Sequence, residues 1–576
     1  MRDLVWARDM TPLIDRISKT YDEVPYTSAA FPVSAPEHLR AVAHLFGLDT
    51  PVPERARVLE LGCAAGGNLI PFAVRHPDAD VVGVDLSPVQ IDIGRGLVEA
   101  MGLANVRLIQ GSIAELGEEL GKFDYIVCHG VYSWVPEEVR AAILDVCDRL
   151  LTDNGVAYVS YNTYPGWKAK EIVRDAMLLR AGDRATAQER LAYARGMIEF
   201  LHEQAAEGSV LGTVMKDHIG MIREGEDFYL SHEYLELCNA PCYFRDFVAA
   251  ARDHGLEYLG DATVASMFAR NYGAAAAPAL LAECGGDQVM LEQLMDFLQN
   301  RTFRQSLLVR AGRGGEIRYQ VDPERVARLH LAGRYVPETG ADGVPQWRYS
   351  GGALVSAGTD ATRVVLERLN AAWPATVPAA ELVAEASAED AGRVIDLITN
   401  LVIGNAVRFR VEPLVVGSMS GAPLAHAAVR TLAAAGEHPM SLFNQWHQPI
   451  KLTPLQRFLL PQLDGAADPE ALVGVVLREV EQGRLHVTRE GQPLTDGDAV
   501  AASVREQVNA ALNLLMINAM LATPPAQPAK EAAATTKQGD KRVEKAPAAK
   551  PAKAANAKAG KPEAAAKPTK APRVKK

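Results

Sequence analysis

The sequence predicts an α/β fold built on one doubly wound, mostly parallel sheet, and three observations support this prediction. Strand and helix patterns alternate through the first third of the chain. A short apolar strand closes on the glycine-rich turn Gly62-Cys63-Ala64-Ala65-Gly66-Gly67, which opens a helix. The next strand pattern ends on an acidic residue, Asp85, nineteen positions after Gly66. The turn and the carboxylate should therefore meet at one edge of the sheet.

Five segments in this first third have the apolar character of buried strands. They are residues 57–61, 81–85, 106–110, 125–129 and 156–161, with helices expected between them. Pro71 falls in the first turn of the helix after Gly66, where a missing amide proton costs little. Pro88 opens the next helix, and Ser87 before it is expected to be the N-cap.

Long amphipathic helices then interrupt the strand pattern, at residues 168–179 and 187–205. A further helix is predicted at 244–254, followed by strands at 256–259 and 303–310. We assign these two strands to the same sheet, which gives a core at 51–167 and the end of the sheet at 256–315. The helical insertion, residues 168–255, should lie near the ligand edge, where it can cover a substrate or pair two subunits.

Two accessory units are predicted beyond the sheet. Helices at 361–369, 379–386 and 388–401 and a strand at 406–411 follow one another in a winged-helix-like order within a middle domain, 316–411. Helices at 452–463, 469–480 and 502–521 indicate a C-terminal helical domain, 412–523. Winged helices often bind DNA, but no Lys/Arg stripe marks a recognition helix here, so we favour contact with protein.

Composition and charge narrow the class of protein. With 576 residues, 48% of them hydrophobic, the chain can form several buried cores. The first residues lack an apolar signal region and no stretch has eighteen uninterrupted apolar residues, which predicts a cytoplasmic protein without a transmembrane segment. Six cysteines are few for this length. Cys238 and Cys242 lack a second Cys/His pair nearby, so we expect free thiols and no metal.

The C-terminal tail, residues 524–576, is rich in Lys, Ala and Pro. From residue 530 onward it carries fourteen Lys or Arg against four Asp or Glu, although the whole chain has a net charge of −11. It has no aromatic residue and should be disordered, because it cannot bury enough surface to offset its ordering entropy. It is either a solubilising extension or a weak contact for nucleic acid or anionic surfaces.

The glycine-rich turn differs from a dinucleotide-binding turn. It lacks the Gly-x-Gly-x-x-Gly spacing, and Glu60 precedes it, which would repel a pyrophosphate but attract an ammonium group. Asp85 is placed to accept hydrogen bonds from the hydroxyls of an adenosine ribose. The pattern Glu60-x-Gly62-x-x-x-Gly66 resembles the first motif of class I S-adenosylmethionine-dependent methyltransferases, with Ala64 where many members have a middle glycine.

The resemblance extends along most of the chain, from about residue 21 to 521. Segments 60–63, 66–71, 84–87, 123–126, 129–136 and 158–167 resemble bacterial methyltransferases that carry a methyltransferase regulatory domain, a group that includes the rickettsial outer-membrane-protein lysine methyltransferases. Segments 232–235, 241–244 and 301–308 resemble the regulatory part, and 463–465 the C-terminal unit. The resemblance implies a Rossmann-like seven-stranded methyltransferase sheet, a dimerising helical part and lysine side chains of protein as methyl acceptors.

Cofactor contacts are expected around the predicted sheet edge. By the resemblance, Glu60 and Gly62 face the methionine end, Asp85 the ribose and Leu86 the adenine, whereas Ser112 stands where an Asp commonly holds the adenine amine. Residues 1–50 precede the first strand, and we interpret them as a lid that brings Tyr26 and Ser28 to the methionine end, although they can equally be an arm on the surface. The expected cofactor residues are Tyr26, Ser28, Glu60, Gly62, Cys63, Gly66, Asn68, Asp85, Leu86, Gln90, Ser112, Ile113, His129 and Gly130.

Aromatic residues gather after the fourth and fifth predicted strands, at 129–136 and 161–167. Aromatic faces hold cations and exclude water, as transfer of a methyl group to an amine requires. We expect Trp134 on this rim and Tyr161, Asn162 and Tyr164 to orient the amine, with His129 a candidate general base. The alternative is ordinary packing at the strand ends, and for His129 a histidine of the core.

Three functions are compatible with these residues. The first is a methyltransferase that acts on protein lysines by direct in-line transfer without metal. The second is a methyltransferase for a small molecule, which would use the same cofactor site. The third is a cofactor-binding regulatory or scaffold protein without turnover. The aromatic rim beside a complete cofactor motif favours an enzyme, and the two accessory domains favour a protein substrate.

Overall fold

The computed structural model describes residues 28–523, apart from residues 183, 185, 226, 341, 342, 344, 357, 358, 420, 437–439, 490 and 491. The first part of the predicted lid, with Tyr26, and the predicted tail at 524–576 lie outside the described residues.

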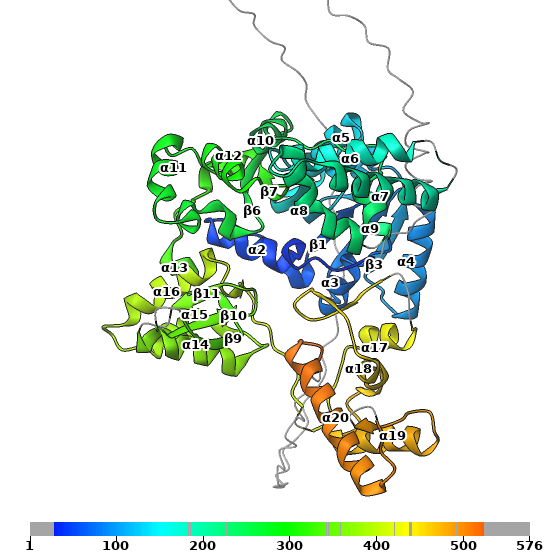
Figure 1. Ribbon diagram of the computed structural model, residues 1–576. Helices are drawn as coiled ribbons and strands as arrows, with labels where there is room; N and C mark the ends of the chain where they lie inside the picture. Colours follow the sequence, from blue (N-terminus) through cyan, green and yellow to red (C-terminus); the bar gives the residue numbers. More distant parts are fainter. Residues whose placement is uncertain are drawn as a thin grey trace, which may run out of the picture. The chain divides into compact units, whose positions relative to one another are not determined.

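A seven-stranded sheet forms the centre of the fold (Figure 1). Its strands are β1 (Arg57–Leu61), β2 (Asp80–Asp85), β3 (Val106–Gln110), β4 (Phe123–Cys128), β5 (Leu151–Asn162), β6 (Leu256–Asp261) and β7 (Phe303–Arg310). They follow the order β3-β2-β1-β4-β5-β7-β6. Strands β1 to β5 pair in parallel, whereas β7 is antiparallel to both β5 and β6. The predicted return of the chain to the same sheet after the insertion is confirmed.

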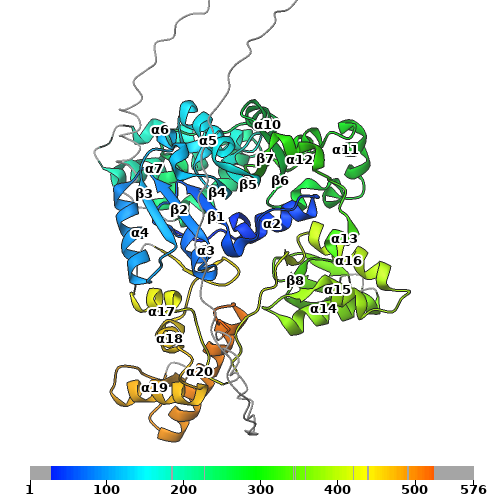
Figure 2. The same cartoon turned by 180° about the vertical axis from the view of Figure 1, so that it is seen from behind.

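Alternate residues of the strands enter two separate cores, as the period-two geometry of a strand requires. Val58 and Val81 pack with helices α2 (Pro36–Leu45) and α3 (Leu69–Arg75) on one face (Figure 2). Their neighbours Leu59 and Val82 pack with α5 (Glu137–Leu150) and α10 (Phe244–Asp253) on the other. Both faces are buried, which explains the almost continuous apolar runs in the parallel strands.

Helix α4 (Pro88–Ala100) begins as predicted, with Pro88 in its first turn and Ser87 as N-cap. The Ser87 hydroxyl accepts a hydrogen bond from the Gln90 amide at 3.1 Å. This cap fixes the direction in which the chain leaves β2, and therefore the position of Asp85 just before it.

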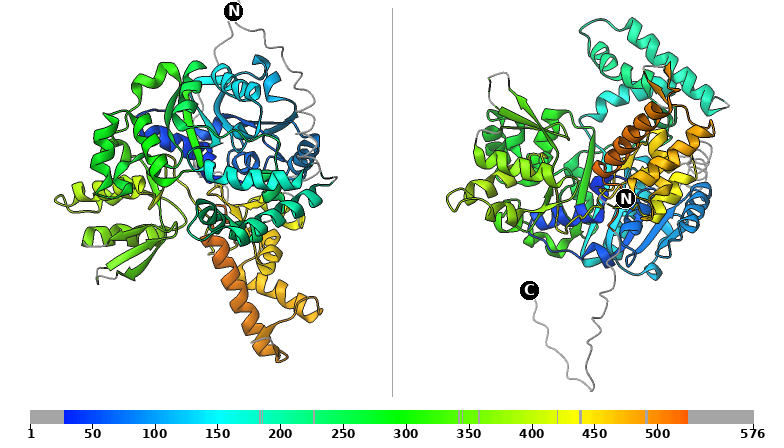
Figure 3. Two further views of the ribbon diagram at one scale, coloured as in Figure 1. Left: turned by 45° about the horizontal axis from the view of Figure 1, so that its top comes forward. Right: turned by 90° about the horizontal axis from the view of Figure 1, so that it is seen from below.

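The insertion after β5 is helical, as predicted, and has more helices than the sequence indicated. It comprises α6 (Trp167–Ala181), α7 (Ala187–Gln204), α8 (Val210–Glu224) and α9 (Asp227–Tyr234), drawn in cyan and green (Figure 3). Apolar residues of these helices, among them Val173, Ile198 and Tyr234, form a core of their own. The insertion therefore packs as a helical bundle of its own and also sends residues of α6 and α9 toward the sheet edge described below.

Between β6 and β7 the chain forms α11 (Ala276–Cys284) and α12 (Gln288–Gln299). A buried arginine of β7 fixes α12 against the sheet: Arg304 Nε lies 2.7 Å from Asp296 Oδ2, and its Nη1 lies 2.9 Å from Glu292 Oε2. The side chains of Arg304 and Glu292 are 0% exposed and that of Asp296 is 1% exposed, so these charges require one another.

The middle region combines small sheets with helices. It contains α13 (Pro323–Val326), α14 (Asp360–Ala372), α15 (Ala379–Ala384) and α16 (Ala391–Ile403). Its strands are β8 (His330–Ala332), β9 (Tyr335–Thr339), β10 (Pro345–Tyr349), β11 (Leu354–Ser356), β12 (Val377–Pro378) and β13 (Arg408–Arg410). The sequence predicted three helices and the last strand; the two three-stranded sheets, β11-β10-β9 and β12-β8-β13, were not predicted, and β8, β11 and β12 have only two or three residues each.

The C-terminal region is mostly helical, as predicted. Its helices are α17 (Ala427–Ala434), α18 (Pro454–Leu459), α19 (Pro469–Glu481) and α20 (Gly497–Ile517), with the short strand pairs β14 (Leu442–Phe443) with β15 (Pro449–Ile450) and β16 (Thr488–Arg489) with β17 (Gln492–Pro493). Ile70 of α3 packs into the core of this region, which ties it to the sheet domain. Within the described part of the chain, no helix is both long and apolar enough to cross a bilayer.

Candidate active site

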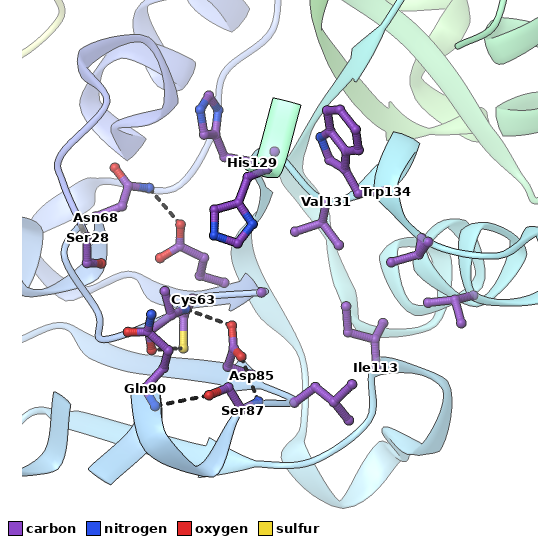
Figure 4. A pocket seen from close by; sticks show the side chains of 18 of the residues that line it. Ser28, Cys63, Asn68, Asp85, Ser87, Gln90, Ile113, His129, Val131 and Trp134 are labelled. Carbon is purple, nitrogen blue, oxygen red and sulfur yellow. Dashed lines mark hydrogen bonds between the residues drawn. The ribbon is translucent and has the colours of Figure 1, made fainter. Parts of the chain in front are cut away.

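A cavity of about 670 Å³ lies at the carboxyl ends of β1, β2, β4 and β5. Most of the residues expected at the site line it, and Figure 4 shows several of their side chains pointing into it. The expected residues on its wall are Ser28, Glu60, Gly62, Cys63, Asn68, Asp85, Leu86, Gln90, Ser112, Ile113, His129, Gly130, Trp134 and Asn162. Gly66, Tyr161 and Tyr164 are not part of this wall, and Tyr26 lies outside the described residues.

The glycine turn brings backbone close to the neighbouring strand ends. Gly62 has φ 75°, and its amide donates to the Val84 carbonyl at 2.8 Å. A Cβ on Gly62 would lie 2.4 Å from Val131 Cγ2, so only glycine fits between the ends of β1 and β4. Gly66, with φ 81°, closes the turn by donating to the Cys63 carbonyl at 2.9 Å. It shapes the loop from behind the cavity wall.

The Asp85 carboxylate is held by backbone amides. Its Oδ2 accepts from the Ala64 amide at 2.8 Å and its Oδ1 accepts from the Ser87 amide at 2.9 Å (Figure 4). A carboxylate has about four acceptor sites, and these two backbone amides orient the carboxylate at the cavity wall, where it can accept from hydroxyl groups. Asp85 can therefore hold a vicinal diol such as that of a ribose.

Glu60 is a buried acid with one carboxylate oxygen unused. It is 3% exposed, and its Oε1 accepts from Asn68 Nδ2 at 2.9 Å. Among the described residues its Oε2 has no hydrogen-bond partner. Burial raises the pKa of Glu60 to about 8, and the charge of Asp85 adds to the shift. An ammonium group placed in the cavity would supply both the missing bond and the missing positive charge.

Asn68 connects Glu60 to distant parts of the chain. Its Oδ1 accepts from the Phe31 amide at 2.9 Å and lies 2.8 Å from Nε2 of His447, in the loop between β14 and β15. Arg75 donates to Nδ1 of that histidine at 3.0 Å, so Nε2 carries the proton and donates to Asn68. His447 was not predicted from the sequence, because nothing in its local sequence distinguishes it from any other histidine.

The part of the predicted lid that is described packs on the glycine turn. Gly67 donates its amide proton to the Ser28 hydroxyl at 2.7 Å, and a Cβ on Gly67 would lie 2.4 Å from the Ser28 carbonyl carbon. Ser28 also pairs with Met440 of the C-terminal region as an isolated bridge. The N-terminal segment thus closes one side of the cavity between the turn and the C-terminal region.

His129 lines the cavity after β4 as an uncharged imidazole. Its Nδ1 lies 2.8 Å from the Tyr158 hydroxyl, and its ring centroid is 3.9 Å from that of Phe31. Burial lowers the pKa of His129 to about 4. A base of such low pKa is a poor acceptor for a proton from an amine, and the contacts fit the alternative of a packed histidine at the cofactor wall.

The four other residues expected to act on the acceptor divide into two pairs. Trp134 and Asn162 reach the cavity. Tyr161, one residue earlier on β5, points to the opposite side, where its hydroxyl lies 3.0 Å from Ser306 Oγ and its ring stacks on Phe247.

Tyr164 is also directed away from the cavity. Its hydroxyl donates to Glu171 Oε1 at 2.5 Å, and Lys168 Nζ lies 3.9 Å from the centroid of its ring. Tyr161 and Tyr164 therefore do not line the cavity that Trp134 and Asn162 reach.

Beyond Trp134 the cavity wall is made by α6 and α9 of the helical insertion, which was expected near the ligand edge, although none of the insertion's residues was named as a site residue. Trp167 and Lys170 of α6 and Tyr229, His232 and Glu233 of α9 all line it. Trp167 is 1% exposed, and its ring meets that of Trp134 edge to face with centroids 6.0 Å apart. This half of the cavity is aromatic and carries a carboxylate, whereas the half near β1 and β2 carries the glycine turn, Glu60 and Asp85.

All six cysteines are free, and the described residues contain no group of three or more His, Cys, Asp or Glu arranged to hold a metal ion.

Three families match different parts of the chain. Residues 58–155 match "Methyltransferase domain", residues 226–310 match "Predicted methyltransferase regulatory domain", and residues 422–520 match "PKMT, C-terminal winged helix domain". The last match places a winged helix in the C-terminal region.

Two proteins of Rickettsia prowazekii (strain Madrid E) are similar in sequence. "Uncharacterized protein RP789" is 32% identical over 523 residues, which cover 87% of this chain and 93% of that protein. "Uncharacterized protein RP028" is 39% identical over 241 residues, or 42% of this chain and 96% of that protein. Among solved structures, PKMT2 from Rickettsia typhi in complex with AdoHcy matches with a TM-score of 0.77 and 27% identity, covering 86% of this chain and 100% of that one.

Proposed function

The chain belongs to the bacterial class I S-adenosylmethionine-dependent methyltransferases that carry a methyltransferase regulatory domain, and from this membership we propose that it methylates lysine side chains of proteins. It is an enzyme, and its cofactor is S-adenosylmethionine. The observation that supports a lysine acceptor is the second half of the cavity, where Trp134, Trp167 and Glu233 offer aromatic faces and a carboxylate to a cation. The solved relative with AdoHcy is named PKMT2, and residues 422–520 match a winged helix domain that also bears the name PKMT.

The cofactor fits the first half of the cavity. In our proposal Glu60 Oε2 receives the ammonium group of the methionine part, and Asp85 receives the two ribose hydroxyls. Leu86 and Ile113 cover the adenine, with Gln90 and Ser112 near its edge. Gly62 lets the chain pass close to the methionine part without a Cβ in the way. Asn68 holds Glu60 in the orientation that this requires.

When bound, S-adenosylmethionine supplies a methyl group on a sulfonium, and the neutral acceptor nitrogen forms the new C–N bond as the C–S bond breaks, leaving S-adenosylhomocysteine (AdoHcy). The protein must therefore deliver a lysine amine without its proton. For a pKa of about 10.4, removing that proton near pH 7.4 costs about 4 kcal/mol. The buried ring of Trp167 and the half-buried ring of Trp134 lower this cost, because an environment with little water disfavours the charged form.

Orientation is the other contribution that these residues can make. Holding the amine in line behind the methyl carbon is worth roughly 7 to 11 kcal/mol in favourable cases. Asn162 lies at the junction of the two halves and is fixed by a hydrogen bond from its Nδ2 to Asn239 Oδ1 at 3.1 Å. Its amide oxygen is the acceptor we propose for orienting the lysine nitrogen.

Labelled S-adenosylmethionine incubated with the protein and a cell lysate tests the proposal. We expect label in protein bands, and hydrolysis of those bands should give methylated lysine. Label that appears only in small molecules would support the alternative of a small-molecule methyltransferase. Cofactor binding without AdoHcy formation, across a broad panel of acceptors, would support a regulatory or scaffold protein instead.

The assembly and the accessory regions are also part of the proposal. We propose that the helical insertion pairs two subunits and that the C-terminal winged helix contacts protein, and sedimentation of the purified chain would test the pairing. Deleting residues 524–576 and measuring binding to nucleic acid and to anionic surfaces would test whether the basic tail contributes weak contacts with them.

A further inference from the structure

The acceptor half of the cavity contains an ion pair of the chain's own residues. Lys170 Nζ of α6 lies 2.8 Å from Glu233 Oε1 of α9, and the two side chains are only 17% and 18% exposed. The same ammonium group lies 4.9 Å from the centroid of the Trp167 ring. Lys170, Glu233 and Trp167 all line the cavity that also contains Glu60 and Asp85.

A carboxylate together with an aromatic face recognises an alkylammonium group. The carboxylate supplies charge and a hydrogen-bond acceptor, and the ring attracts the cation through its quadrupole. Lys170 has the same side chain as the acceptor that we propose for the enzyme. A lysine of the chain thus occupies a position whose chemistry suits a lysine of the substrate.

We propose that Glu233 and the face of Trp167 are the site that receives the acceptor ammonium, and that Lys170 occupies this site until the acceptor displaces it. This inference rests on the proposed function, because it names the binding site of the lysine acceptor. The exchange replaces one cation by another, so the partly buried Glu233 carboxylate is never left without a positive partner. The proposal concerns binding alone, before the amine loses its proton.

If Lys170 and Glu233 form a purely structural ion pair, substitutions should affect acceptor binding differently than if Lys170 occupies the acceptor site. In a structural pair, removal of either partner disturbs the same contact, so both substitutions should act in the same direction. If Lys170 occupies the acceptor site, removal of the Lys170 ammonium vacates the site and strengthens acceptor binding, whereas removal of the Glu233 charge weakens acceptor binding. The sign of the two effects therefore separates the explanations.

The same helix provides a matched control. Lys168 stacks on Tyr164, whose hydroxyl donates to Glu171, so this neighbouring group also combines a lysine, an aromatic ring and a carboxylate. None of its three residues lines the cavity. Lys168→Met and Glu171→Gln therefore change the same residue types, both within α6, without altering the proposed acceptor site.

The experiment is a calorimetric titration of the full chain, loaded with AdoHcy, with N-α-acetyl-lysine methylamide. We expect Lys170→Met to bind this lysine analogue about three- to tenfold more tightly than the unaltered chain, and Glu233→Gln to bind it more weakly by at least the same factor. The two control variants should stay within about twofold. Effects of the same sign in Lys170→Met and Glu233→Gln, or effects no larger than in the controls, would overturn the inference.

AdoHcy affinity, measured beforehand for each variant, shows that the fold is intact. Should Glu233→Gln lose that affinity, Glu233→Asp keeps the charge but shortens its reach, and it should also weaken binding of the analogue. Failure of the proposed function would be seen in a different experiment. A lysate in which no lysine is methylated would reject the function, but it would not change the titration results. If protein lysines are labelled but the Lys170 and Glu233 variants bind the analogue as the unaltered chain does, only the proposed acceptor site is rejected.

Discussion

His447 Nε2 lies 2.8 Å from Asn68 Oδ1, and Nδ2 of the same asparagine lies 2.9 Å from Glu60 Oε1. A histidine in the C-terminal region therefore orients the residue that orients the buried acid of the cavity. Burial and the charge of Arg75 lower the pKa of His447 to about 3, so it stays neutral at ordinary pH and keeps donating to Asn68.

Replacing this histidine should weaken the cofactor. His447→Ala leaves Asn68 Oδ1 without one of its donors and frees Asn68 to rotate away from Glu60. The cost of losing one partner of a buried hydrogen bond is about 1–3 kcal/mol, so we expect cofactor affinity to fall by roughly five- to a hundredfold in calorimetry. His447→Gln retains an N–H donor and should recover part of the loss. His486→Ala, at an exposed position of the same region, is the control, and an equal loss there would show that the contact with Asn68 is not the cause.

Asp85→Ala should abolish cofactor binding while the fold remains. The proposed bonds from two ribose hydroxyls to a charged acceptor are worth about 1.5–3 kcal/mol each, which together amount to more than a hundredfold in affinity. The measurement is the rise in melting temperature on addition of AdoHcy, which should disappear. Asp92→Ala, on the exposed side of α4, should keep the full rise. Unchanged affinity in Asp85→Ala would show that the ribose is held elsewhere.

Cofactor binding should release a proton near pH 7. Because the pKa of Glu60 is raised to about 8, most of the protein without cofactor carries a protonated Glu60 at pH 7. The cofactor ammonium favours the ionised form, so binding expels that proton, and affinity should rise with pH up to about 8. Calorimetry at pH 7 in buffers of different ionisation enthalpy measures the release directly. Glu60→Gln should release no proton from this site, and equal release by both proteins would contradict the assignment.

The same raised pKa has an opposite effect on stability without cofactor. The folded state holds the Glu60 proton up to about pH 8, whereas the unfolded chain loses it near the ordinary glutamate pKa of 4.5. The folded state therefore binds more protons between these values, and this residue makes the protein less stable as the pH rises through that window. Denaturant unfolding of Glu60→Gln and the unaltered chain should diverge progressively from pH 5 to pH 8, with the variant the more stable.

Gly62→Ala should destabilise the protein and impair cofactor binding together. The new Cβ would lie 2.4 Å from Val131 Cγ2 at a residue with positive φ, which predicts a loss of about 1–3 kcal/mol from backbone strain alone. Gly96→Ala is the matched control, because Gly96 lies in helix α4 and its added Cβ would meet nothing within 4 Å. This control should be more stable by about 0.5–1 kcal/mol. Denaturant unfolding measures both, and a harmless Gly62→Ala would show that the turn can relax.

The parts of the site that depend on short stretches of sequence were predictable. The glycine turn, the acid before it, Asp85 and the cap at Ser87 lie within thirty residues, and their geometry follows from how strands and helices meet. Tyr161 was wrongly expected beside Asn162 in the cavity. Tyr161 and Asn162 are consecutive on β5, and consecutive residues of a strand face opposite sides, so only one of them could reach the cavity.

His447 and Glu233 could not be found in this way. His447 is separated from Asn68 by 379 residues and Glu233 from Lys170 by 63, and these contacts depend on how whole regions pack. In the middle region, β8 and β11 have three residues each and β12 has two, which is too short for an alternating hydrophobic pattern to be recognised. Long elements, by contrast, were placed well: α7 and α19 each differ from the predicted span by one residue at the C-terminal end.

The position of β7 between β5 and β6 has a consequence for biosynthesis. A chain emerging from the ribosome contains β5 well before β7, so the edge of β5 stays without its neighbour until residue 310 has been made. Pairing across such a long stretch is slow, because the intervening chain must first be brought together. Even then the contact between His447 and Asn68 is missing, because His447 is translated more than a hundred codons later. A product that ends before His447 would thus lack the hydrogen bond to Asn68 and should bind the cofactor more weakly than the full-length protein.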